Sequence, residues 1–367
     1  MAAGLFELRK DAITGWWVAT VVDRAFHRDR FALAADPIAD GGHCQNCVDP
    51  PGDGVRLRTL KDYAFHVVGT EEEARQLDAS LVQVALSTAR ASGSWRTAVA
   101  ARGEHRPLHA VGTAAIADLL GLCRAAIADA RQAGQTEYVQ VVQNWGAQAG
   151  ARTNHLCLDL YDLPQVPHRV AEEIGGAARY VIREGVCPWC RLVAEETARP
   201  DRLIHEDESS VAFAPYASRS PFEVWVVPRQ HAADFGRSSQ ADLNATAESL
   251  RQVLGRLATL DGPPYNLVLH TAPLKEQVDA TFHWHWEIHP RLREIAGLEI
   301  GTGLPVNPVS PEDAVDELLR HARRGEEPAA FAVDRAVDRP VDRPADRPVD
   351  RTGARSTHEP ASRDGGG

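Results

Sequence analysis

The chain has 367 residues, with 40 basic and 51 acidic side chains and a formal net charge of −11. This length is enough for two or more domains, and an apolar fraction of 44% can fill their cores. No apolar run reaches the roughly 18 residues of a membrane-spanning helix, and no signal-peptide pattern opens the sequence. We therefore expect a cytoplasmic protein that binds neither membranes nor, given its acidic charge, nucleic acids.

Two similar halves follow each other along the chain. Helices are predicted over 113–133 and 240–260, where apolar residues recur at helical spacing. Each helix precedes an apolar strand that starts at a tyrosine, Tyr138 or Tyr265, and then a strand that carries histidines. The repeated order predicts an α+β fold built by duplication. We place the first half at residues 1–175 and the second at 176–325.

The C-terminal segment, residues 326–367, has a different composition. It contains a repeated Val-Asp-Arg-Pro motif followed by a polar tail that ends in three glycines. Proline at every fourth residue blocks helix formation, and the alternating charges bury nothing. We predict a disordered tail, with a docking segment for a partner as the alternative.

Four of the six cysteines form two CxxC pairs, Cys44/Cys47 and Cys187/Cys190. Without a secretory signal, this spacing favours metal binding over disulfides. A CxxC pair can also be redox-active or simply buried. Of the remaining two cysteines, Cys123 lies on the apolar face of the first predicted helix, and we expect it in the core.

Each CxxC pair is followed by two histidines at corresponding places in its half. In each half one histidine precedes the helix, His109 or His231, and the other starts the last strand, His155 or His283. A single histidine is more often a surface or core residue than a ligand. Two thiolates and two imidazoles nevertheless form a typical structural zinc site. The sequence therefore predicts two Zn²⁺ ions per chain.

Six segments together resemble the galactose-1-phosphate uridylyltransferase family of the histidine-triad superfamily; they are residues 8–18, 144–155, 215–231, 265–273, 283–292 and 296–314. The resemblance implies a duplicated histidine-triad-like unit, with an antiparallel sheet, long helices and a pseudo-two-fold axis. It also implies a homodimer and the same two zinc sites, one formed by Cys44, Cys47, His109 and His155 and the other by Cys187, Cys190, His231 and His283.

The family resemblance further implies nucleotidyl transfer. In such enzymes the active strand reads His-Pro-His-x-Gln, and its second histidine attacks the α-phosphorus of a nucleotide sugar. Sugar 1-phosphate leaves, and the nucleotide passes to a second sugar phosphate. A covalent intermediate of this kind divides one difficult displacement into two easier ones.

The sequence departs from this pattern at the nucleophile. Cys157 occupies the place of the attacking histidine, Asp159 that of the glutamine, and Arg152 that of a small polar residue that faces the phosphates. A cysteine attacks as the thiolate and needs a lowered pKa. Arg152 or a nearby metal ion could lower it, whereas the charge of Asp159 opposes this.

In the second half, His285 matches the position of Cys157. His285 with Glu287 could act as nucleophile or base; the alternative is that His285 and His289 only form hydrogen bonds along the strand. His270 is expected as a pocket residue or a further ligand. Other predicted substrate contacts are Arg24, Arg28 and Asn144, each alternatively a solvated surface group. Gly301 and Gly303 are further predicted contacts, in a glycine-rich segment that suits phosphate but is also typical of ordinary turns.

Three functions remain open from the sequence. The first is a zinc-containing nucleotidyltransferase with Cys157 in the nucleophile's place. The second is a histidine-triad phosphorylase or hydrolase centred on His285. The third is a nucleotide-sugar-binding protein without catalysis. The expected ligands are a nucleotide sugar and a sugar 1-phosphate.

Overall fold

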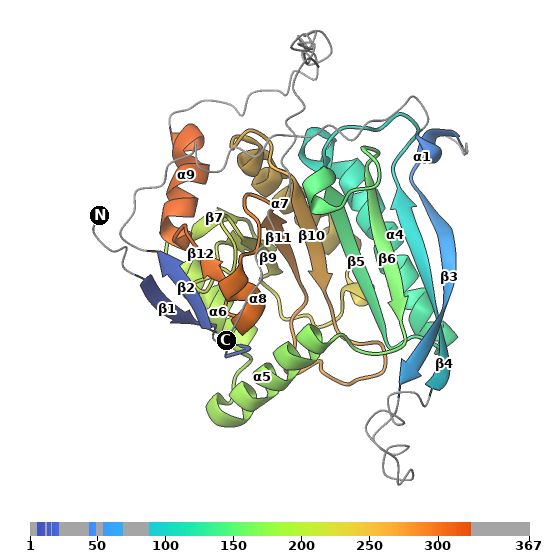
Figure 1. Cartoon of the computed structure of the whole chain (residues 1–367), viewed down its shortest axis with the longest axis horizontal. Helices are drawn as coiled ribbons and strands as arrows, with labels where there is room; N and C mark the ends of the chain where they lie inside the picture. The colour runs from blue at the N-terminus through green and yellow to red at the C-terminus, as the bar shows by residue number, and fades with distance from the viewer. Residues whose placement is uncertain are drawn as a thin grey trace, which may run out of the picture. The chain divides into compact units, whose positions relative to one another are not determined.

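The computed structural model describes residues 6–11, 13–15, 17–21, 44–48, 54–68 and 88–323 (Figure 1). The predicted substrate contacts Arg24 and Arg28, and the predicted disordered tail, lie outside the described residues. Within these ranges no helix combines the length and the apolar character needed to cross a membrane.

A nine-stranded sheet organises the molecule, and all neighbouring strands in it are antiparallel. Its order is β3 (Arg56–Val68), β4 (Thr88–Val99), β6 (Cys157–Leu163), β5 (Tyr138–Trp145), β10 (Tyr265–His270), β11 (His285–Pro290), β9 (Val224–Pro228), β8 (Ser210–Phe213) and β7 (Leu203–Glu206).

The strand order shows the duplication. The two tyrosine-led strands β5 and β10 pair at the centre, with Asn144 opposite Asn266. From this pair the order runs outward as β6, β4, β3 in the first half and as β11, β9, β8 in the second. The predicted α+β fold with a duplicated antiparallel sheet is thus confirmed. Both halves contribute to one continuous sheet.

The two long helices, α4 (Thr113–Ala133) and α7 (Gln240–Ala258), pack against each other and cover one face of the sheet (Figure 1). A glycine at φ 69°, Gly134, ends α4, as left-handed glycines commonly do. Ser239 and Asp242 form a capping box that starts α7. The buried face of α4 carries Ile116, Leu119, Leu120, Cys123 and Ile127, so Cys123 is a core residue as predicted.

On the other face of the sheet, α6 (Pro188–Thr197) packs against β7 and β8, and its Trp189 contacts Trp225 of β9. Helix α5 (His168–Glu184) packs beside α6, and its Arg169 reaches Glu287 of β11. The remaining described elements are a small sheet of β1 (Phe6–Lys10), β2 (Trp17–Val21) and β12 (Val306–Asn307), with the helices α1 (Gln45–Val48), α8 (Gly297–Thr302) and α9 (Pro311–Arg323).

Successive side chains of β11 point alternately into the apolar core and to the opposite face of the sheet. Trp286 and Ile288 enter the apolar core beneath α4 and α7, whereas His285, Glu287 and His289 belong to the opposite face because successive side chains of a strand alternate. Pairing with β10 sets His289 opposite Asn266. One prediction differs: β6 and β11 begin two residues after His155 and His283, so these histidines precede the strands.

Candidate functional site

A first group of metal-ligand side chains is formed by Cys44, Cys47, His105 and His155, whose donor atoms all lie within 4.8 Å of one another. The sulfur of Cys47 is 3.2 Å from Nε2 of His105 and 3.4 Å from Nδ1 of His155. The sulfur of Cys44 is 3.8 Å from the same Nδ1 of His155. The chain thus brings three of the four predicted ligands together, with a different second histidine.

The structure corrects the prediction of His109 as the fourth ligand. His109 lies in a 3₁₀ turn after the loop that reaches the thiols, and it is not a member of the group. Two hydrogen bonds hold that loop at the site: the amide of Gly103 donates to Cys47 Sγ, and the amide of Leu156 donates to the carbonyl of Glu104. His105, which follows directly, is therefore the histidine that the loop presents.

The second group contains the four residues predicted for it: Cys187, Cys190, His231 and His283. The sulfur of Cys190 is 3.2 Å from Nδ1 of His231 and 4.0 Å from Nδ1 of His283. Burial, with the second thiol nearby, raises the pKa of Cys190 to about 11. Two adjacent thiols of this kind ionise together only when a cation compensates their charge.

Both groups fit a tetrahedral zinc ion. With Zn–S near 2.3 Å and Zn–N near 2.0–2.1 Å, a thiolate sulfur and an imidazole nitrogen on one tetrahedral zinc ion should lie about 3.6 Å apart, and the sulfur–nitrogen distances here, 3.2–3.8 Å in the first group and 3.2–4.0 Å in the second, lie around that value. His155, His231 and His283 each direct Nε2 to a backbone carbonyl oxygen, at 3.1, 2.5 and 3.0 Å respectively. These hydrogen bonds leave the lone pair on Nδ1, which faces the thiols. Burial, with neighbouring His231 and His285, also lowers the pKa of His283 to about 3, so its ring is neutral.

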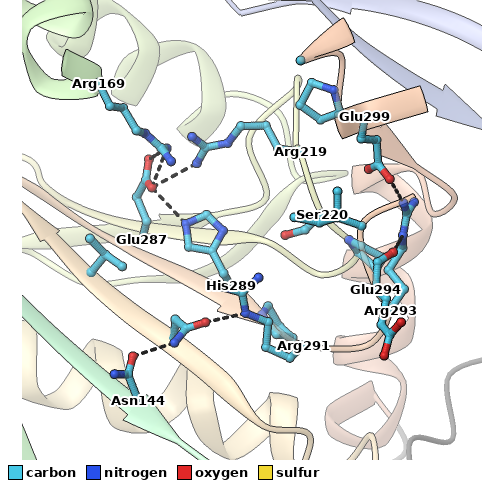
Figure 2. A pocket seen from close by; sticks show the side chains of 17 residues that line it. Asn144, Arg169, Arg219, Ser220, Glu287, His289, Arg291, Arg293, Glu294 and Glu299 are labelled. Atoms are coloured by element: carbon cyan, nitrogen blue, oxygen red, sulfur yellow. Dashed lines mark hydrogen bonds and ion pairs between the residues drawn. The ribbon is translucent and has the colours of Figure 1, made fainter. Parts of the chain in front are cut away.

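A cavity of about 500 Å³ opens on the α5 side of the sheet, at the boundary of the two halves (Figure 2). Among predicted residues it is lined by Asn144, Glu287 and Gly303. The other lining residues are Arg169, Arg219, Ser220, Pro221, Asn266, Val268, His289, Pro290, Arg291, Arg293, Glu294, Ile295, Glu299 and Pro305. The predicted residues Arg152, Cys157, Asp159, His270, His285 and Gly301 do not line it.

The carboxylate of Glu287 is fully buried in the cavity floor. It accepts hydrogen bonds from Arg169 at 2.7 Å, from Arg219 at 3.0 Å and from Nε2 of His289 at 2.9 Å (Figure 2). Burial opposes its ionisation, but Arg219 and His270 outweigh this and hold the pKa of Glu287 well below its usual value. The floor is thus a cluster of paired charges in fixed positions.

His285 lies below this floor and not in the cavity. Its side chain is fully buried, 4.2 Å from the Trp189 ring, and its Nδ1 donates to the carbonyl of His283. A ligand in the cavity therefore does not touch the predicted catalytic His285. His270 is also buried, and its Nδ1 lies 2.9 Å from a Glu173 carboxylate oxygen. Burial lowers its pKa, but the charges of Glu173 and Glu287 outweigh this and raise it.

Two further carboxylate and histidine groups have donor atoms within 4.8 Å of one another: Glu173, His270, His285 and Glu287, and Glu223, Glu287 and His289. Guanidinium groups already neutralise these carboxylates. Arg169 lies 3.6 Å from Glu173 and 2.7 Å from Glu287, and Arg219 contacts both Glu223 and Glu287. The two cysteine groups therefore fit a metal ion better than these carboxylate and histidine groups do.

The surroundings of Cys157 do not favour a nucleophile. Burial and the Asp159 charge raise the pKa of its thiol to about 12, so the thiolate is scarce at neutral pH. Arg152, which could have offset this, pairs with Asp159 at 3.1 Å and lies over the Trp95 ring. These findings count against Cys157 as the attacking group.

Arg291 stands out among the four cavity arginines. Arg169, Arg219 and Arg293 each pair with a glutamate, whereas Arg291 has no carboxylate partner within the described part of the chain. Its Nε donates to Oδ1 of Asn266 at 2.5 Å, and Asn266 in turn donates to Oδ1 of Asn144 (Figure 2). This chain of hydrogen bonds orients one uncompensated cation at the cavity wall.

The sequence analysis missed several site residues: His105, Arg169, Arg219, Asn266 and Arg291. It named His289 only as a residue that forms hydrogen bonds along its strand. Three of the missed residues, Arg219, Asn266 and Arg291, lie inside the segments that carry the family resemblance, and this was an available signal. No local pattern indicates Arg169. It lies in the first turn of an amphipathic helix, where an arginine is usually a surface residue.

Comparison with known proteins gave consistent matches. A family described as a domain of unknown function (DUF4921) matches residues 103–343. The ADP-glucose phosphorylase of Arabidopsis thaliana is 30% identical over 330 residues, which cover 84% of this chain and 90% of that protein. The galactose-1-phosphate uridylyltransferase of Thermotoga maritima is 29% identical over 199 residues, 52% of this chain and 62% of that protein.

The solved structures agree with these matches. A crystal structure of an ADP-glucose phosphorylase from Arabidopsis thaliana with bound ADP-glucose superposes with a TM-score of 0.67 and 27% identity, over 86% of this chain and 98% of that one. The fold and these relatives define a galactose-1-phosphate uridylyltransferase-like protein. Within this class, the chain belongs to the DUF4921 family.

Proposed function

We propose that the cavity binds a nucleotide sugar and that the protein transfers its nucleotidyl group to a phosphate-bearing acceptor. The observation that carries this proposal is the uncompensated guanidinium of Arg291 beside Asn266 and Asn144, in a cavity shared by both halves. The named relatives, an ADP-glucose phosphorylase and uridylyltransferases, support the same class of substrate and reaction.

The cavity has the chemistry that a nucleotide sugar requires. Its pyrophosphate is a dianion, and a guanidinium can donate two parallel hydrogen bonds to phosphate oxygens. Ser220 adds a hydroxyl at the wall, buried and without a hydrogen-bond partner among the described residues. A volume of about 500 Å³ is within the usual range for small-ligand sites. Asparagine amides suit the hydroxyl groups of a sugar.

The two cysteine and histidine groups would hold zinc in a structural role. Each offers four protein ligands and leaves no open coordination position, and none of these ligands lines the cavity. The zinc ions would fix the loops before β6 and β11, and with them the strands that lead to the site. The homodimer that the family resemblance implies remains part of the proposal, and sedimentation analysis measures it.

A second candidate function is binding without transfer. Cys157 occupies the place that the resemblance to galactose-1-phosphate uridylyltransferases gives to the nucleophile. The raised pKa of its thiol therefore favours binding without transfer. The two candidates share the ligand and differ in whether any bond is broken. They are separated by turnover and not by affinity.

Isothermal titration of the full-length, zinc-replete chain with ADP-glucose and UDP-glucose tests the binding step. We expect saturable binding of at least one nucleotide sugar, and weaker binding of glucose 1-phosphate and of free glucose. Absence of binding by either nucleotide sugar would contradict the proposed function. Binding followed by release of unchanged ligand would favour the second candidate.

A further inference from the structure

Nucleotidyl transfer through a covalent intermediate needs a nucleophile that the ligand can reach. Neither Cys157 nor His285 is among the residues that line the cavity. Of the residues that line it, one is a histidine, His289, at the end of β11. Its side chain is 16% exposed, so the ring is accessible from the cavity and yet held by its neighbours.

The contacts of His289 fix its protonation pattern. Nε2 lies 2.9 Å from a carboxylate oxygen of Glu287, and a carboxylate only accepts, so Nε2 carries the hydrogen. The neutral ring therefore has its lone pair on Nδ1. Glu287 is itself held by Arg169 and Arg219, so the ring is oriented by a rigid partner, as in other nucleophile and base pairs.

His289 also lies next to the predicted phosphate contact. It is paired with Asn266 across β10 and β11, and Asn266 accepts from the guanidinium of Arg291. Figure 2 shows His289 between the Glu287 cluster and Arg291. A phosphate held by Arg291 would thus lie beside the imidazole.

We propose that His289, through Nδ1, is the nucleophile of the transfer reaction; this inference rests on the proposed function. Nδ1 forms a bond to the α-phosphorus, and the bond from that phosphorus to the bridging oxygen breaks, so sugar 1-phosphate leaves with the electron pair. The ring keeps its Nε2 hydrogen and becomes cationic against Glu287. An oxygen of an acceptor phosphate then attacks the phosphorus, and the N–P electron pair returns to Nδ1.

The test is to trap the intermediate. The zinc-replete chain is incubated with ADP-glucose or UDP-glucose without acceptor, quenched under alkaline conditions, digested and mapped by mass spectrometry. We expect a nucleotidyl increment on the peptide containing His289. His289→Gln should abolish it and reduce turnover by at least about 1,000-fold, as loss of a nucleophile does, with ligand affinity changed only a few-fold. Added imidazole should restore part of the turnover of His289→Ala.

Matched variants complete the test. His168→Gln makes the same exchange at an exposed histidine of α5. Cys157→Ser changes the residue in the place of the family's attacking histidine. Both variants should keep the adduct and the turnover. An adduct on Cys157, turnover retained by His289→Gln, or ligand binding without any turnover by the native chain would overturn the inference while leaving the binding proposal intact. Failure to bind any nucleotide sugar would instead contradict the proposed function itself.

Discussion

Glu287 is the residue on which the cavity floor depends, because two arginines and a histidine share its carboxylate. Glu287→Gln would leave Arg169 and Arg219 partly uncompensated in a buried place. Removing one partner of a buried ion pair typically costs about 3–5 kcal/mol, and we expect a loss of this size in the free energy of unfolding in urea. Glu208→Gln, at an exposed glutamate, should be neutral, and an equally small effect for Glu287→Gln would contradict the paired-charge floor.

Arg291 is the residue that we expect to discriminate phosphorylated ligands. A hydrogen bond to a charged group contributes about 1.5–3 kcal/mol, so Arg291→Gln should weaken ADP-glucose or UDP-glucose binding by about 10- to 100-fold. Titration calorimetry measures this. Arg183→Gln, on the exposed end of α5, is the control. Unchanged affinity in Arg291→Gln would place the phosphates elsewhere.

The ligands of the first metal group can be checked one histidine at a time. The structure predicts that His105→Ala lowers the zinc content from two ions per chain towards one, because the first metal group then loses one of its two nitrogen ligands. His109→Ala should keep two ions, because His109 is outside the group. Elemental analysis after dialysis gives both values, and the reverse pattern would restore His109 as the ligand.

At the scale of elements, α4 and α7 are joined by a hydrogen bond of 2.6 Å from the hydroxyl of Thr113 to Glu248. Arg251, with Thr113 and Gln252, lowers the pKa of Glu248 from 4.5 to about 2. A lowered carboxyl pKa stabilises the fold above the unfolded value, and this contribution is lost as the pH falls through the folded value. Because the side chain is about a third exposed, we expect only about 0.5 kcal/mol.

The measurement for Glu248 compares unfolding of the native chain and Glu248→Gln between pH 7 and pH 2. The stability difference should be constant at neutral pH and shrink between about pH 4.5 and pH 2. Glu276→Gln, at an exposed glutamate, should show no difference at any pH. A difference that grows in acid would contradict the assigned charge state.

Elements of this fold were predictable where local patterns are strong. The limits of α4 agree with the prediction because glycines flank a run of helical periodicity. The starts of β6 and β11 do not agree, because His155 and His283 turn towards the cysteines before strand pairing begins. Metal-ligand geometry there overrides the alternating pattern. The choice of His105 over His109 depends on the same loop geometry, which spacing alone does not determine.

At the scale of the whole molecule, the cavity combines residues that are distant in sequence. Arg169 lies on α5, and Arg219 lies in the loop between β8 and β9. Arg291 directly follows β11, and Asn144 lies on β5 of the first half. Duplication is what brings them together, since β5 and β10 pair at the sheet centre. Local sequence patterns predict Asn144 and Glu287 as site residues. They do not predict that three arginines from separate elements lie around them.

Phosphorus NMR of the zinc-replete chain, incubated with ADP-glucose or UDP-glucose and inorganic phosphate, tests the central claim most directly. Transfer predicts that the nucleotide-sugar resonances decline while those of a nucleoside diphosphate and glucose 1-phosphate rise in equal amounts, and that Arg291→Gln slows this conversion. Resonances that stay unchanged with both nucleotide sugars, at ligand concentrations that titration shows to be saturating, would contradict the claim of nucleotidyl transfer.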